Sequence, residues 1–255
     1  MSEGERSHLA DQRRFSTTIA LPALGTAEIF TLGIAAAYPY LDQWWAWLAP
    51  DEQARADRLF RSADRARFIV SRGGLRLLLS RYLACAPDAL TLTYGPQGKP
   101  SLSHPALEFN LAHSGDWVVY GVSRDRAIGV DVEQILPRRH LDGLEQRCLT
   151  PCERATLSPE PTERLRQFLA YWTVKEAHLK AIGQGLSYPM QRVEVGWQPE
   201  PHLRSPAIAP NLAVSAWTVS TWEVAEDAIA AVCVAAVPCT LRHQPFPLIT
   251  APDRT

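Results

Sequence analysis

The sequence lacks a long hydrophobic run, and this absence excludes several classes of protein. Its most apolar stretch, residues 228–237, is ten residues long and is followed by Pro238. That length is too short to span a bilayer, so the stretch predicts a buried strand and no membrane association. The first fifteen residues are charged and contain no apolar segment, which does not fit a signal peptide.

An excess of charge of one sign is also missing. Lys and Arg number 26 and Asp and Glu 27, for a formal net charge of −1. Nucleic-acid binders usually carry a clear basic excess, so no nucleic-acid partner is expected. Hydrophobic residues make up 46% and charged residues 21%, which is ordinary for a globular protein and excludes disorder throughout the chain.

Cysteine is scarce, and its spacing shows no disulfide framework. The five cysteines are Cys85, Cys148, Cys152, Cys233 and Cys239. Cys148 and Cys152 would meet on a helix, but a zinc site would need two more ligands. We therefore expect reduced thiols in a cytoplasmic protein.

Hydrophobic periodicity predicts an alternation of helices and strands. Long helices are expected over residues 63–83 and 162–182, with Gly183 placed to cap the second. Shorter helices are expected over 51–60, 141–149 and 151–157, and strands over 28–37, 90–94, 107–111, 117–123, 127–133, 192–197, 213–224 and 228–237. The last two strands are expected to form a hairpin about residues 225–227.

The order of helix followed by strands occurs twice, with a seam near residues 123–127. This predicts an α+β fold of two similar halves, residues 28–125 and 126–238. Each half would be a small, mainly antiparallel sheet against a long helix. Residues 1–27 are expected to be peripheral, and the Pro-rich residues 239–255 are expected to be a loose surface tail.

Two acidic residues alternate with apolar ones in the predicted strand 127–133. Residues two apart share a face of a strand, so Asp131 and Glu133 lie together, opposite Ile128, Val130 and Val132. Two adjacent carboxylates repel each other, which favours a bound cation, and hard oxygen ligands suit Mg²⁺. An edge strand with its acids in solvent is the alternative interpretation.

A glutamate interrupts the apolar stripe of the long helix 162–182. Glu176 follows Trp172 by four residues and precedes Lys180 by four. Burial would raise its pKa and a nearby cation would lower it, so it could serve as a base. A partly exposed Glu176–Lys180 pair is the plainer alternative.

Two further features suit phosphate. His113 ends a predicted strand, where it could donate to a phosphate or bond to its own loop. Residues 51–81 contain eight arginines against four acidic residues, a local net charge of +4. Arginine binds phosphate through a fork of N–H groups, although a solvated helix face has the same composition.

In this order the motifs resemble those of the 4′-phosphopantetheinyl transferase superfamily. The resemblance covers about residues 50–237 and rests on Gly98-Lys99-Pro100, Phe109-Asn110-Leu111-Ala112-His113-Ser114, Ile128-Gly129-Val130-Asp131-Val132-Glu133 and Trp172-Thr173-Val174-Lys175-Glu176-Ala177-His178-Leu179-Lys180. The length and the Gly-Gln-Gly-Leu-Ser at 183–187 resemble the monomeric, surfactin-synthetase-activating type.

The resemblance implies a fold and an activity. The fold would be a pseudo-twofold pair of α+β halves with the active site at their interface. The activity would be Mg²⁺-dependent transfer of phosphopantetheine from coenzyme A to a serine of an apo acyl, polyketide or peptidyl carrier protein. The other product would be 3′,5′-ADP, and the enzyme would be a cytoplasmic monomer.

The resemblance also assigns residues. Glu176 would be the general base, and Lys175 and Lys180 would face the pyrophosphate during catalysis. The metal would be held by Asp131, Glu133 and Glu153, and coenzyme A would be contacted by Arg55, Arg67, Lys99, Pro100, His113, Lys175 and Lys180.

Two positions depart from the family pattern. Ala112 stands where many relatives have serine, so one hydroxyl contact to coenzyme A would be missing. Glu52 stands where some relatives have lysine, so the 3′-phosphate site would be weaker or rebuilt from Arg55, Arg58 and Arg67.

Two other functions remain open at this point. One is a module that binds coenzyme A or a carrier protein without catalysis, although the four residues 131, 133, 176 and 180 are all present. The other is a Mg²⁺-dependent phosphohydrolase that uses water as the acceptor.

Overall fold

The computed structural model describes residues 18–102, 107–124, 126–185, 188–204, 217–235 and 238–248. Most of the predicted peripheral segment 1–27, the start of the predicted strand 213–224, residues 186–187 of the 183–187 motif and the last seven residues of the predicted tail lie outside this description. The chain divides into two compact units. Unit 1 is Met1–Leu21, Ile34–Thr91 and Phe246–Thr255, and unit 2 is Pro22–Gly33 and Leu92–Pro245.

Unit 1 is helical in its described part. It contains the 3-10 helix η1 (Ile34–Tyr40), the helices α2 (Leu41–Ala46), α3 (Pro50–Asp57) and α4 (Ser62–Leu83), and the 3-10 helix η2 (Pro87–Ala89). Trp44 of α2 is fully buried. A Cβ atom on Gly73 of α4 would lie 2.5 Å from the Cβ of Trp44, so the glycine makes room for the indole.

A buried ion pair holds α3 to α4. Glu52 accepts two hydrogen bonds from the guanidinium of Arg76, at 3.0 and 2.7 Å, and both side chains are almost fully buried. Arg76 also donates to the carbonyls of Pro87 and Leu90. The glutamate that departs from the family pattern therefore serves the core of unit 1.

Unit 2 contains two larger sheets. The first has the strand order β11-β1-β5-β4 and the second the order β6-β10-β9. Their strands are β1 (Thr26–Gly33), β4 (Glu108–Ser114), β5 (Trp117–Ser123), β6 (Ile128–Gln134), β9 (Thr218–Ala225), β10 (Ala228–Val234) and β11 (Thr240–Pro245). All pairings within them are antiparallel except that of β1 with β11.

Smaller elements complete unit 2. Two-residue strands form the pairs β2 (Thr93–Tyr94) with β3 (Pro100–Ser101) and β7 (Val195–Gly196) with β8 (His202–Leu203). The helices are α5 (Leu141–Cys148), α6 (Pro151–Ala155), α7 (Pro161–Ala181) and the 3-10 helix η4 (Met190–Arg192). The predicted α+β class, with small and mainly antiparallel sheets and two long helices, is confirmed.

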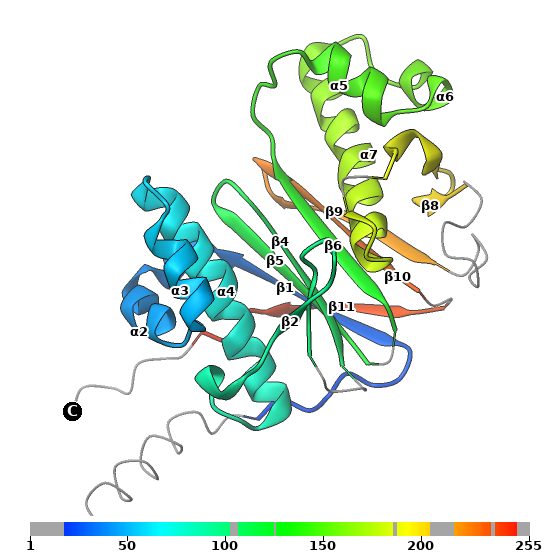
Figure 1. The fold of residues 1–255 in the computed structure, drawn as a ribbon. Coiled ribbons are helices and arrows are strands. Elements are labelled where there is room, and N and C mark those ends of the chain that lie inside the picture. Colours follow the sequence, from blue (N-terminus) through cyan, green and yellow to red (C-terminus); the bar gives the residue numbers. More distant parts are fainter. Residues whose placement is uncertain are drawn as a thin grey trace, which may run out of the picture. The chain divides into compact units, whose positions relative to one another are not determined.

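Two apolar clusters order unit 2 in layers. Ile128, Val130 and Val132 of β6 are buried in a cluster that also contains Ile29 and Val119 of the first sheet. On the other face of the second sheet, α7 packs against β10 and β6 through a second cluster (Figure 1). The second sheet therefore lies between the first sheet and α7.

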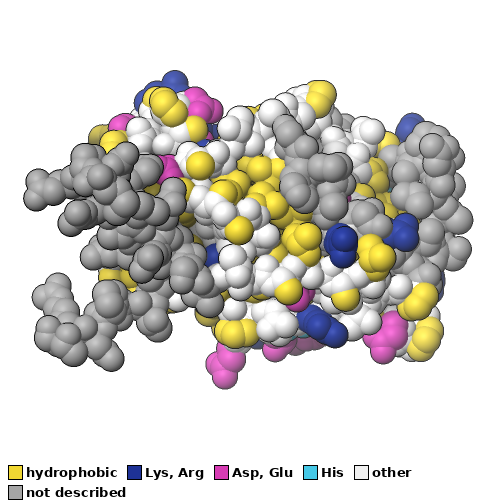
Figure 2. All heavy atoms as spheres, turned by 90° about the horizontal axis from the view of Figure 1, so that it is seen from below, with side chains coloured by type: hydrophobic (Ala, Val, Ile, Leu, Met, Phe, Trp, Pro, Cys, Tyr) yellow, Lys and Arg dark blue, Asp and Glu magenta, His cyan; other side chains and the backbone are white. Residues whose placement is uncertain are grey.

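The predicted loose tail is wrong for residues 240–245. These residues form β11, which pairs in parallel with β1 at the edge of the first sheet. Proline is tolerated at the end of an edge strand, because no neighbour on its outer side needs its N–H. Surface charges of both signs lie among hydrophobic side chains on the face drawn in Figure 2, as expected for a net charge of −1.

Candidate functional site

Strand β6 presents its acidic residues to α7. A Cβ atom on Gly129 would lie 1.9 Å from the carbonyl oxygen of Ala177 and 2.5 Å from the amide nitrogen of Ala181, so only glycine lets the helix backbone approach this closely. Asp131 follows on the same face of the strand and is 5% exposed. The interpretation that its carboxylate lies in solvent is therefore wrong.

Helix α7 brings a base and a cation to the same place. Lys180 donates from Nζ to Oδ1 of Asp131 at 2.6 Å, so its ion pair is with the strand rather than with Glu176. Glu176, one turn earlier, is 4% exposed. Oδ2 of Asp131 and Oε1 of Glu176 are buried and have no hydrogen-bond partner among the described residues.

Burial sets the protonation of this cluster. It raises the pKa of Asp131 to about 6, against the opposing attraction of Lys180. Burial, followed by repulsion from Asp131, raises the pKa of Glu176 to about 7. Two buried carboxylates beside one ammonium leave an excess of negative charge, which a cation or a bound proton would relieve.

Glu133 is held by two residues that sequence reasoning did not assign. Its Oε2 accepts from Arg138 at 2.5 Å and from the hydroxyl of Ser114 at 3.1 Å. The same hydroxyl accepts from the backbone N–H of Gln134. Ser114 stood in a motif noted for its histidine, and Arg138 in a loop without a pattern, so only the spatial arrangement shows these contacts.

Glu153 and Lys175 form an ion pair with each other. Lys175 Nζ donates to Glu153 at 2.6 Å and to the carbonyls of Cys148 and Met190, which uses all three of its N–H groups. The carboxylate of Glu153 also accepts from the backbone N–H groups of Thr150 and Val195. The pair is buried, and its hydrogen bonds use all three N–H groups of Lys175 and three of the acceptor sites of Glu153.

Besides Lys175 and Lys180 on α7, the predicted coenzyme A contacts in unit 2 lie on two strands and a loop. Pro100 is in β3, and His113 is an exposed residue of β4. Lys99 donates to the backbone carbonyls of Ile128 and Ala181, at 3.3 and 3.2 Å. Its ammonium is therefore engaged inside the protein.

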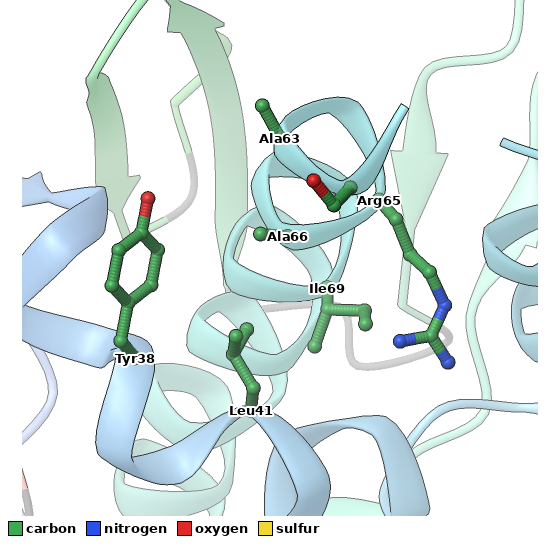
Figure 3. Close-up of a pocket in the computed structure, with 7 residues that line it drawn as sticks. Tyr38, Leu41, Ala63, Arg65, Ala66 and Ile69 are labelled. Atoms are coloured by element: carbon green, nitrogen blue, oxygen red, sulfur yellow. The ribbon is translucent and has the colours of Figure 1, made fainter. Parts of the chain in front are cut away.

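The predicted contacts in unit 1 lie on α3 and α4. Arg67 pairs with Asp64 at 2.8 Å, and the guanidinium of Arg55 lies over the ring of Phe68, 5.2 Å from its centroid. Unit 1 also contains a pocket of about 420 Å³ (Figure 3). None of the predicted site residues lines it, and its lining residue Arg65 is paired with Asp57.

The acidic cluster fits a divalent cation only if a bound molecule supplies further oxygen ligands to the cation. Within the described ranges, no three His, Cys, Asp or Glu side chains converge to hold a metal ion by themselves. Mg²⁺ is commonly held by one or two carboxylates together with phosphate oxygens and water. The unpartnered oxygens of Asp131 and Glu176 fit that kind of site.

Comparison with known proteins identifies the family. Residues 127–233 match the family model of the 4′-phosphopantetheinyl transferase superfamily, and residues 37–124 match that of the 4′-phosphopantetheinyl transferase N-terminal domain. The 4′-phosphopantetheinyl transferase HetI of Nostoc sp. is 34% identical over 197 residues, which cover 75% of this chain and 78% of HetI. The chain therefore belongs to the 4′-phosphopantetheinyl transferase superfamily.

Two further relatives match over shorter spans. The protein slr0495 of Synechocystis sp. is 42% identical over 159 residues, 61% of this chain and 65% of its own length. The 4′-phosphopantetheinyl transferase psf-1 of Bacillus pumilus is 30% identical over 58% of this chain and 63% of its own length. In the part of the chain that the structure describes, no helix is both long and apolar enough to cross a membrane.

Proposed function

We propose that this protein transfers 4′-phosphopantetheine from coenzyme A to a serine of an apo carrier protein and releases 3′,5′-ADP. The observation that carries the proposal is the cluster of Asp131, Glu176 and Lys180, in which both carboxylates are buried and each has one oxygen without a hydrogen-bond partner among the described residues. Such a cluster costs folding free energy unless it binds something. A divalent cation supplies the positive charge that the cluster lacks, and a diphosphate would supply further oxygen ligands to that cation.

Asp131 and Glu176 would hold Mg²⁺, with Glu133 beside them. The metal, when bound, would neutralise the charge of the diphosphate and polarise its oxygens. Its protein ligands would be few, so phosphate oxygens and water would complete the coordination. Glu153 is left out of this set because Lys175 and backbone N–H groups occupy both of its oxygens.

Glu176 and Lys180 would have different roles in the reaction. Glu176 would take the proton of the carrier serine, and the serine oxygen would attack the β-phosphorus of coenzyme A. The bond between that phosphorus and the bridging oxygen would break, and 3′,5′-ADP would leave with the electron pair. Lys180 would stabilise the charge that develops on the leaving group. Phosphoryl transfer gains mainly from such positioning and electrostatics.

Several finer assignments belong to this proposal. Contacts of Arg55, Arg67, Pro100 and His113 with coenzyme A remain predictions, as do the cytoplasmic location and the monomeric state. The carrier protein would belong to fatty-acid, polyketide or nonribosomal-peptide synthesis.

Intact-mass measurement of an apo carrier protein tests the function. The carrier is incubated with coenzyme A, Mg²⁺ and this protein, and we expect a gain of one phosphopantetheine on its serine. Release of phosphopantetheine with no change in carrier mass would instead support a phosphohydrolase. Binding of coenzyme A with neither product would support a non-catalytic module.

A further inference from the structure

Lysine is rare in this chain, and each lysine has an internal partner. Lys99, Lys175 and Lys180 are the only lysines in the sequence. Lys175 pairs with Glu153, and Lys180 pairs with Asp131. Lys99 differs from both because it has no ion pair with a described residue, and its Nζ donates only to the backbone carbonyls of Ile128 and Ala181.

These two carbonyls belong to the elements that form the site. Ile128 is the first residue of β6 and lies three residues before Asp131. Ala181 is the last residue of α7 and directly follows Lys180. A cation suits this end of a helix, because the last carbonyls lack partners within the helix and carry partial negative charge. The ammonium thus joins β6 to α7 beside the contact between Asp131 and Lys180.

The loop that carries Lys99 is itself fixed in place. The N–H of Gly95 donates to the carbonyl of Lys99 at 2.9 Å, and Gly98 closes the turn with φ of +77°. Beyond the end of α7, Gly185 has φ of +62°, and a Cβ atom there would lie 3.3 Å from the Cβ of Gln97. The loop therefore meets the α7 end at a second point.

The close packing of β6 against α7 allows little movement of the strand along the helix. Because Gly129 lies directly against the helix backbone at Ala177 and Ala181, a shift along the helix axis would cause a clash or open a gap. Burial lowers the pKa of the Lys99 ammonium, as expected for a cation placed among backbone groups rather than in solvent.

We propose that Lys99 is a positioning residue, which fixes the register of α7 on β6 and so places Lys180 on Asp131 for the reaction. This proposal rests on the proposed function. It differs from a role in binding coenzyme A, because the ammonium acts through the backbone of Ile128 and Ala181 and not through the substrate. The two carbonyls use two of the three N–H groups of the ammonium.

Steady-state kinetics of Lys99→Met and Lys99→Arg separate the two roles. We expect Lys99→Met to lower kcat by tenfold or more, because small misplacements of reacting groups are costly, while KM for coenzyme A changes less than twofold. Lys99→Arg keeps the cation and the donors and should recover most of kcat. A higher KM with unchanged kcat would overturn the proposal in favour of direct substrate binding.

A second measurement needs no activity. With isotope-labelled lysine, NMR of the metal-free protein shows only three side chains, so the ζ-nitrogen and ε-methylene signals of each can be followed. Lys99→Met should shift the signals of Lys180 and leave those of Lys175 in place, since Lys175 is the internal control on the same helix. Unmoved Lys180 signals would overturn the proposal.

The two measurements distinguish a failure of the proposed function from a failure of the proposed role of Lys99. If the wild-type protein does not modify a carrier, the proposed function is wrong, but the Lys180 signals still report whether Lys99 sets its position. If Lys99→Met does not fold, Lys99→Arg alone must retain the wild-type Lys180 signals. A shift there without unfolding would contradict the role of the ammonium.

Discussion

Glu176 has a folding cost that depends on pH. Its pKa is about 7 in the folded protein against an ordinary value of 4.5, because it is buried beside Asp131. Below about pH 4.5 the group is protonated in both the folded and the unfolded state, so its ionisation does not lower the free energy of unfolding. As the pH rises to 7 the unfolded chain loses the proton first, so stability falls. Above pH 7 the group is ionised in both states, and the free energy of unfolding is lower by about 3 kcal/mol than it is below pH 4.5.

Glu176→Gln should therefore stabilise the metal-free protein above pH 7 and have little effect near pH 4. Urea unfolding with a chelator present, at both pH values, measures this difference. Glu226→Gln, an exposed position in the β9–β10 turn, is the control. The same Glu176 variant should lose transfer by roughly 10²- to 10⁴-fold. Equal stability of wild type and Glu176→Gln at pH 8 would contradict the buried, uncompensated carboxylate.

Single residues also show where sequence reasoning stops. The alternation in β6 placed Asp131 and Glu133 on one face, and the structure has them there. It could not show that α7 covers that face, because this depends on Gly129 meeting the helix backbone far along the chain. The motif that contains Glu176 likewise contains Lys175. Because neighbouring residues are about 100° apart around a helix, the two side chains have different surroundings. The spacing in the sequence does not reveal which residues those surroundings contain.

Among elements, the packing of β6 on α7 is the contact on which the site depends. Gly129→Ala would place a Cβ atom 1.9 Å from the backbone oxygen of Ala177, so the strand and the helix would have to separate. We expect a loss of about 3 kcal/mol in the free energy of unfolding, together with a loss of transfer activity. Thermal unfolding and the carrier-mass assay measure the two effects.

Gly143→Ala is the matched control for that change. Gly143 lies inside α5 and a Cβ atom there would meet nothing within 4 Å, so alanine should stabilise the helix by about 1 kcal/mol. Opposite signs for two Gly→Ala changes in one unit would separate close backbone approach from helix propensity. If both variants were equally stable, the close approach of β6 and α7 would be wrong.

Elements with strong periodicity were predictable, and those fixed by distant partners were not. The structure has α4 and α7 within a residue or so of their expected bounds, and β9 and β10 form the expected hairpin. Gly183 follows the end of α7 with φ of +71°, as its capping role requires. β11 was missed because its residues are polar and close to several prolines, and its pairing partner β1 lies more than 200 residues earlier.

The distribution of charge over the whole molecule bears on the partner. The chain has a net charge of −1, but residues 51–81 have a local excess of four positive charges. The structure neutralises part of this excess, since Arg76 pairs with Glu52 and Arg65 with Asp57. Arg58 and Arg61 are exposed and have no ion pair with any described residue. We therefore expect these two arginines to attract the proposed carrier protein if it has acidic groups near its serine.

Association with the carrier should therefore weaken as salt is added. Electrostatic steering raises association rates and is screened over about 8 Å at physiological ionic strength. We expect the double variant Arg58→Gln/Arg61→Gln to lower the association rate several-fold at low salt and to flatten its dependence on salt. Arg166→Gln in unit 2, which removes a charge already paired with Glu223, should change the rate less. Stopped-flow measurements at salt concentrations from about 20 mM to about 500 mM compare the three proteins. Over this range the electrostatic screening length falls several-fold. A rate that is independent of salt in the wild type would show that the arginines of residues 51–81 take no part in attracting the carrier.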